Sequence, residues 1–348
     1  MRRVAYWSLA LALVGCAAEE TSGSHVGPGT GGTAGIGGEG GTAGTGGSVQ
    51  QPSLGECPAL VATRIPTEEL FNLTAGDGFA YGFRQQELIQ VDKDGTLRVI
   101  ASASGTASKP LYYQGGVYWI ELDINTARIR RWDEGDDQVE TLSELDPTYG
   151  SPRDLLVAGG SLYFIADPAF KGSRVLFKLV DGMPQSVGSF PYDCLRFEGS
   201  PTGDVMCVDG GFQHLAPGEA KAKALSLVGT HGALHNDHLI YVSVDEEIID
   251  VSLRNLTEKV LLTLNAEIPG ARFADAGIVM NDDWVLFTTG RNSDPVRLWG
   301  LRTDGSYCAV TEDFEGPGSL SLWGETAYRV TPTGMHFIDL SAVSSPEP

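Results

Sequence analysis

Three of the six histidines lie within one short stretch, HGALHNDH, and imidazoles grouped in this way raise the question of a metal site. An extended segment from His231 to His235 separates the two side chains by about 13 Å at roughly 3.3 Å per residue, too far to share one ion. His235 and His238 flank an Asn-Asp turn and can face each other, but two ligands make a weak site. We therefore expect a solvated hairpin tip here and no metal.

The acidic run DKDG (Asp92–Gly95) resembles the beginning of a calcium-binding loop. A complete loop needs a third oxygen ligand before the glycine and a glutamate further on. The residues that follow are Thr96 and Leu97, so this pattern is not completed. A hairpin turn with its glycine in the left-handed region explains the run better.

Motifs for covalent catalysis are missing from the sequence. No Ser, Cys or Lys lies in a recognisable nucleophile motif, and the pattern G-x-S-x-G does not occur. No C-x-x-C pair occurs either, so neither a zinc knuckle nor a redox motif is supported. The sequence indicates no cofactor and names no catalytic residue. Any site must be assembled from distant parts of the chain. Which side chains can come together therefore depends on the strands and turns that the sequence predicts.

A tight turn followed by an aromatic or aliphatic strand recurs about every 41 residues, as in QGGVYW, AGGSLYF and NDDWVLF. Gly-Gly and Asn-Asp pairs suit two-residue hairpin turns because a positive φ costs them little. The turns begin at Gly76, Gly115, Gly159, Gly199, Asn236, Asp282 and Gly324.

A second landmark follows these turns, a strand, an Asp-Gly turn and another strand, as in LIQVDKDGTLRVI (Leu88–Ile100) and VLFKLVDGMPQSV (Val175–Val187). Each period therefore contains four strands, which is typical of a β-propeller blade. The sequence predicts an all-β fold, a seven-bladed β-propeller over residues 54–341. Six or eight blades are the alternatives, because insertions and deletions blur such counts.

The two ends of the repeat predict how the ring closes. The last period supplies only three strands, and the segment ALVATRI (Ala59–Ile65) forms a lone strand before the first period. Pairing the two removes an open sheet edge. The pattern resembles bacterial seven-bladed propellers of the broad quinoprotein and YVTN type, in architecture alone. It lacks the Gly-His and Trp-Asp signature of WD repeats and the Ser-x-Asp-x-Gly-x-Thr-Trp box of sialidases, so the resemblance implies no substrate.

Charged residues just before each innermost strand should form a ring at one mouth of the propeller channel, a place where this fold commonly binds ligands. The alternative is that they are surface charges that neutralise one another. These candidate binding residues are Lys109, Arg153, Asp154, Asp193, His231, Arg272 and Asp275.

Four cysteines follow the N-terminal region, and an even number in an exported chain suggests two disulfides with three possible pairings. They are Cys57, Cys194, Cys207 and Cys308.

The segment DCLRFEGSPTGDVMCV predicts which of these cysteines pair. It is typical of two strands joined by a loop at 198–203, so that Phe197 faces Asp204 and Cys194 falls opposite Cys207. Opposed residues have Cα atoms about 4.5–5.5 Å apart, within the usual disulfide range. We expect this bond, and a second between the remaining two cysteines.

The N-terminus indicates export. The apolar run Val4–Gly15 is shorter than the roughly 20 residues that span a membrane and follows two arginines, as in a signal peptide. Its end, Leu13-Val14-Gly15-Cys16, resembles the lipobox of bacterial lipoproteins. This resemblance implies removal of residues 1–15, acylation of Cys16 and, because Ala17 rather than Asp follows, an outer-membrane location. Several acyl chains anchor a protein stably where one does not.

Composition describes the remaining segments. Residues 16–53 are rich in glycine and threonine and predict a flexible tether, and 342–348 predict a disordered tail. The chain has 24 basic and 45 acidic side chains and a net charge of −21. Such a surface repels nucleic acid and anionic headgroups, so nucleic acid is excluded as a partner. We expect a monomer.

Two functions remain compatible with these features. The first is a non-catalytic, membrane-tethered propeller that binds a protein, a glycan or an envelope component. The second is a tethered hydrolase or lyase whose site is at the channel mouth. Convergence of three or more ring residues would favour the enzyme, and a splayed ring would favour binding.

Overall fold

The computed structural model divides the chain into two units, Met1–Ser48 and Val49–Pro348, and only the second contains described residues. The predicted signal peptide, lipidated Cys16, tether and tail all lie outside the described residues. The residues that the structure describes are 62–65, 70–168, 172–194, 196–208, 211–268, 272–290, 296–302, 307–314, 318–331 and 334–341.

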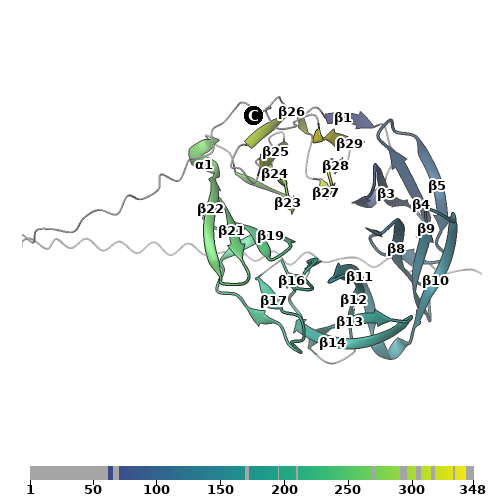
Figure 1. The fold of residues 1–348 in the computed structure, drawn as a ribbon. Coiled ribbons are helices and arrows are strands. Elements are labelled where there is room, and N and C mark those ends of the chain that lie inside the picture. The colour runs from purple at the N-terminus through teal and green to yellow at the C-terminus, as the bar shows by residue number, and fades with distance from the viewer. Residues whose placement is uncertain are drawn as a thin grey trace, which may run out of the picture. The chain divides into compact units, whose positions relative to one another are not determined.

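Seven antiparallel sheets lie side by side around a central axis, from the purple first blade round to the yellow last one (Figure 1). Blades 1 and 2 contain β2 (Phe71–Ala75), β3 (Phe79–Arg84), β4 (Glu87–Asp92) and β5 (Leu97–Ser102), then β6 (Thr106–Ala107), β7 (Leu111–Tyr113), β8 (Gly116–Leu122), β9 (Ala127–Asp133) and β10 (Gln138–Leu145). Blades 3 and 4 contain β11 (Ser151–Ala158), β12 (Ser161–Asp167), β13 (Ser173–Val180) and β14 (Met183–Pro191), then β15 (Phe197–Gly199), β16 (Val205–Cys207), β17 (Gln213–Leu215) and β18 (Lys223–Ala224). Blades 5 and 6 contain β19 (Gly229–His235), β20 (His238–Ser243), β21 (Glu247–Ser252) and β22 (Thr257–Thr263), then β23 (Phe273–Met280), β24 (Trp284–Thr289), β25 (Val296–Arg302) and β26 (Tyr307–Phe314). Blade 7 contains β27 (Ser319–Trp323), β28 (Thr326–Thr331), β29 (Gly334–Asp339) and β1 (Ala62–Ile65).

Helical structure in the described part is short. It consists of η1 (Pro147–Tyr149) and α1 (Leu264–Glu267), both in connections between blades. No helix among the described residues is both long and apolar enough to cross a membrane.

The ring closes as the sequence predicts. The innermost strands contact one another in the order β2, β7, β11, β15, β19, β23 and β27, and β27 contacts β2 again. Strand β1 pairs with β29, with Ala62 opposite Ile338 and Ile65 opposite Met335. The prediction of seven blades, the last built from three C-terminal strands and one N-terminal strand, is therefore confirmed.

The core lies between neighbouring blades, because alternate residues of one strand point to opposite faces of its sheet. All six residues of β24 are buried. Trp284 and Leu286 pack with blade 7, whereas Val285 and Phe287 pack with blade 5. This two-sided burial explains why the strand reads as a continuous apolar run in the sequence.

Blades 3 and 4 approach each other closely at their inner turns. A Cβ atom at Gly199 would lie 2.2 Å from the Val157 carbonyl oxygen, so only glycine fits. Next to it, the Gly159 amide donates to the Ser200 carbonyl at 3.0 Å. Here glycine is required for the contact between blades.

The predicted disulfide between Cys194 and Cys207 is present, with Cα atoms 5.8 Å apart, but the predicted strand register is wrong. Phe197, not Cys194, is the residue opposite Cys207. The reason is the loop between β15 and β16. It starts later than predicted, at Ser200, whose amide and side chain bond to Asp204.

Cys194 reaches its partner from outside the strand. It lies in the connection between β14 and β15, where its amide approaches the Pro191 carbonyl at 3.4 Å. The expected bond between Cys57 and Cys308 lies outside the described residues, since Cys57 and the side chain of Cys308 are not described.

Candidate binding site at the mouth face

We define the mouth face as the face of the ring on which the innermost strands begin. Near this face the innermost strands depart from regular pairing. The register shifts between Phe71 and Thr74, between Pro152 and Leu155, between Gly229 and His231, and between Phe273 and Ile278. Bulges of this kind turn side chains out of the sheet and are common next to functional sites.

In blade 2 the irregularity is a complete break between β6 and β7, and Lys109 lies in it. Ser108 is still held to β8, because its amide donates to the Ile120 carbonyl and its hydroxyl accepts from the Ile120 amide, both at 2.9 Å. Pro110 has no N–H to continue the ladder. The strand is therefore released at Lys109.

Lys109 lies among the inner walls of three blades. Asp154 of β11, together with Arg196 and Glu198 of blade 4, is close enough to influence its charge. Burial lowers the pKa of the Lys109 amine below its ordinary value, and the Arg196 guanidinium lowers it further. The residue nevertheless has an exposed surface. Both observations hold for a side chain that water reaches but that protein surrounds on most sides.

Asp154 is the second unusual group. It lies in the bulge of β11, and burial raises the pKa of its carboxyl group, although Arg153, Lys109 and Arg174 act in the opposite direction. The side chains of Lys109 and Asp154 make no hydrogen bond, and no ion pair within 4.0 Å, with any described residue. Both are therefore available to a ligand.

Arg196 and Glu198, by contrast, are engaged in contacts between blades. Arg196 pairs with Glu198 and extends from blade 4 to the Ile278 carbonyl of blade 6, at 3.3 Å. Glu198 accepts a hydrogen bond of 2.6 Å from the Leu234 amide of blade 5. Gly277 lies beside this guanidinium and has φ of +87°, a backbone conformation that favours glycine.

Asp193 is the residue of blade 4 that the sequence predicts for the ring, whereas Arg196 and Glu198 were not predicted. A signal for them was present. Two charged residues spaced two apart at the start of an innermost strand lie on the same face of the sheet and therefore near each other. The error in the strand register concealed this.

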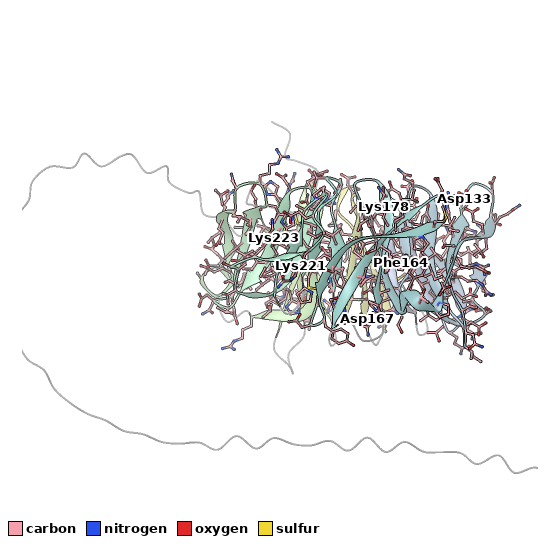
Figure 2. The ribbon with its side chains drawn as sticks, turned by 90° about the horizontal axis from the view of Figure 1, so that it is seen from below. Asp133, Phe164, Asp167, Lys178, Lys221 and Lys223 are labelled. Atoms are coloured by element: carbon pink, nitrogen blue, oxygen red, sulfur yellow. A yellow bond between two sulfur atoms is a disulfide. The ribbon has the colours of Figure 1, made fainter. Side chains whose placement is uncertain are left out.

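Arg153 and Arg174 share one carboxylate near the mouth face. Asp167 lies 2.7 Å from Arg153 and 3.1 Å from Arg174. Arg174 is buried, and its guanidinium lies 5.3 Å from the ring centre of the exposed Tyr192 and 6.0 Å from that of Phe197. Figure 2 shows Asp167 near one rim of the ring and Lys178 near the other.

The other members of the predicted ring are spread out. His231 packs against the ring of Phe273, with centroids 5.3 Å apart. Arg272 is exposed and lies 3.8 Å from Glu246. Asp193 is exposed, directly before Cys194, and the side chain of Asp275 is not described. Of the seven candidates, Lys109 and Asp154 are the pair that influence each other electrostatically and lack a direct partner.

The histidine hairpin and the Asp92 turn have the structures that the sequence predicts. His235 and His238 lie opposite each other, but His235 bonds to Asp282 at 2.9 Å and His238 to Asp250 at 2.8 Å. Gly95 has φ of +85° in its turn. Among the described residues, no group of three or more His, Cys, Asp or Glu is placed to hold a metal ion.

Neither a protein family model nor a curated protein sequence matches this chain. Solved structures do. The structure of YCF48 bound to D1 peptide is 14% identical, with a TM-score of 0.60 over 85% of this chain and 100% of that one. A chain of the mitotic checkpoint complex is 10% identical, with a TM-score of 0.56 over 86% of this chain and 99% of that one. A prolyl endopeptidase is 15% identical, with a TM-score of 0.57 over 82% of this chain but only 49% of that one. At these identities the likeness concerns the propeller fold.

Proposed function

We propose that this protein is a non-catalytic binding module, tethered to the bacterial envelope by a lipid on Cys16, and that its mouth face binds a protein, a glycan or an envelope component. The observation that carries the binding proposal is the mouth face itself. Register shifts in the innermost strand pairs of blades 1, 3, 5 and 6, and the break at Lys109, all occur near this face. Irregularities of this kind turn side chains out of the sheet, where a ligand can reach them.

The splayed ring favours binding over catalysis. Arg153, Arg272 and His231 each contact a different neighbour instead of meeting at one point. Propeller chains of similar extent include one whose structure contains a bound peptide, which supports a peptide or protein as the ligand.

The test of this proposal is capture of ligands from envelope extracts by the immobilised full chain. Reversing two exposed charges at the mouth face, with Arg153→Glu and Arg272→Glu, should reduce capture about tenfold or more by disrupting complementary contacts. The matched control is Arg98→Glu with Arg254→Glu. These arginines are also exposed and ion-paired, but they lie on the outer strand of blade 1 and in the β21–β22 turn. Equal capture by both double variants would contradict a site at the mouth face.

A hydrolase or lyase remains the second candidate, because burial shifts the pKa values of Lys109 and Asp154 in the directions that favour their neutral forms. Such shifts suit a proton donor and acceptor. The prolyl endopeptidase lends it little support, since the present chain spans about half the length of that one. Turnover of a captured ligand that Asp154→Asn abolishes would favour this candidate.

Anchoring is tested by Cys16→Ala. We expect this variant to lose acylation and to move from the membrane fraction to the soluble fraction, because the acyl chains are the proposed anchor. Fractionation after a high-salt wash, with mass spectrometry of the N-terminal peptide, measures both effects. A Ser53→Ala variant is the control and should stay with the membrane. If Cys16→Ala also stays there, the lipobox interpretation is wrong.

A further inference from the structure

Lys109 and Asp154 are opposite charges on adjacent blades that do not contact each other. Both are partly withdrawn from water, which is costly for a charge without a partner. Arg196 and Glu198, which also influence the charge of Lys109, are paired with each other. Arg153 and Arg174, which influence Asp154, are paired with Asp167. The mouth face therefore presents one positively charged hydrogen-bond donor and one negatively charged acceptor on adjacent blades, and neither is paired with a described residue.

The last residue of a peptide carries the complementary groups. Its terminal carboxylate accepts from an ammonium group, and its main-chain N–H donates to a carboxylate. We infer that Lys109 and Asp154 bind the C-terminal residue of a peptide, with the Lys109 amine on the terminal carboxylate and the Asp154 carboxylate on the adjacent N–H. This inference rests on the proposed binding function and names its ligand class.

The position of Arg196 favours a chain end over an internal segment. Its side chain extends from blade 4 to the Ile278 carbonyl of blade 6, and Glu198 beside it bonds to blade 5. These contacts connect three inner walls close to Lys109. We expect these side chains to block a peptide that enters from the mouth face. Its last residue would then stop beside them, with its terminal carboxylate at Lys109.

The preceding residues of the peptide could lie on Tyr192, because the Arg174 guanidinium beneath that ring also influences the charge of Asp154. Tyr192 is 58% exposed and is supported from beneath by the buried guanidinium of Arg174. An exposed aromatic ring held in this way offers an apolar surface for a side chain. The net charge of −21 repels an acidic peptide at long range, but physiological salt screens that repulsion beyond about 8 Å.

Binding should depend on pH through the pair. The pKa of Lys109 is lowered, so the amine loses its proton, and the carboxylate contact, at a lower pH than an ordinary lysine would. The pKa of Asp154 is raised, so its acceptor is lost as the pH falls through that value. Arg196, Glu198, Arg153, Arg174 and Asp167 are the other charges that face the two groups. Binding should therefore be strongest between the two pKa values.

The test uses the full chain and a library of random hexapeptides, made once with free C-terminal acids and once with C-terminal amides. Peptides captured at about 0.15 M salt are identified by mass spectrometry, and their affinities are measured by fluorescence polarisation. We expect the acids to be captured and the amides to bind about tenfold or more weakly, because the amide removes the charged acceptor.

Two variants of Lys109 separate charge from shape. Lys109→Met should weaken binding of the acids to the level of the amides. Lys109→Arg should retain binding and remove the decline at alkaline pH, because a guanidinium stays charged. Lys221→Met makes the same change of charge at an exposed site next to the outer strand of blade 4, and should bind like the parent.

Folding is checked independently of binding. Because the pKa of Lys109 is lower in the folded state than in the unfolded state, the charged amine opposes folding at neutral pH, and stability rises as the pH passes through that range. Lys109→Met should therefore melt at the same temperature as the parent or higher. Loss of binding with an unchanged or raised melting temperature supports a binding role.

The outcomes are distinct. Equal binding of acids and amides, or binding unaffected by Lys109→Met, overturns the recognition of a terminal carboxylate and leaves the proposed function standing. Capture of envelope glycan with no capture of peptides from either library also overturns the recognition of a terminal carboxylate and leaves the proposed function standing. If neither peptides nor envelope components are captured, the proposed function fails as well.

Discussion

Replacing Cys194 and Cys207 together by alanine should destabilise the propeller by about 3 kcal/mol, the value expected for a disulfide that closes a loop of this size. For a domain of this length the melting temperature should fall by about 5–10 °C. The effect should extend to the mouth face. The bond holds the connection that leads into Arg196, so its loss should also weaken ligand capture.

Calorimetry of the parent and the double variant measures the first effect, and the pull-down from envelope extracts measures the second. A digest of the unreduced parent provides the control and should yield a peptide pair linked through these two cysteines. A digest that links Cys57 to either of them, or equal melting of the two proteins, would contradict the bond.

Removing strand β1 should have a larger effect than removing everything before it. A chain that begins at Pro66 lacks β1, which leaves β29 as an open edge and removes Ala62 from the core between blades 6 and 7. We expect it to melt at least about 10 °C below the parent, or to aggregate. A chain that begins at Gln51 retains β1 and should melt with the parent.

A point variant tests the same closure without shortening the chain. Ala62→Asp places a charge in a position that is 4% exposed, next to Trp284 and Ile338, where no cation is available to pair with it among the residues of that cluster. It should destabilise the protein to a similar extent. Thermal melting and size-exclusion chromatography distinguish loss of stability from aggregation. A chain from Pro66 that melts with the parent would contradict closure by β1.

The cost of burying charges near the mouth face links stability to the proposed binding function. Burial disfavours the charged forms of both Lys109 and Asp154, and neither has a direct partner among the described residues that would offset this. Groups of this kind reduce stability without a benefit in the folded chain alone. Their presence on adjacent blades is most simply explained by a ligand.

The repeat could be read from the sequence because its signals are local. Each hairpin turn needs residues that tolerate a positive φ, such as Asn236 or Gly115, and the strands that follow are short apolar runs. The closure by β1 followed from counting strands in the last period. The turns and strands depend on residues within one period, and closure needed only the count of strands at the two ends of the repeat.

The arrangement of the site was decided by the tertiary structure. Whether Lys109 comes close enough to Asp154 to influence its charge, and whether Arg196 reaches blade 6, depends on where each inner strand is broken or bulged, and a sequence pattern does not position such breaks between blades. The hairpin of Cys194 and Cys207 illustrates the same limit. The bond was predicted from a strand register that is wrong, because the hydrogen bonds between Ser200 and Asp204 make the loop start later and place Phe197 opposite Cys207. The sequence thus determined the ring and its blades, whereas packing between blades determined which charges meet at the axis.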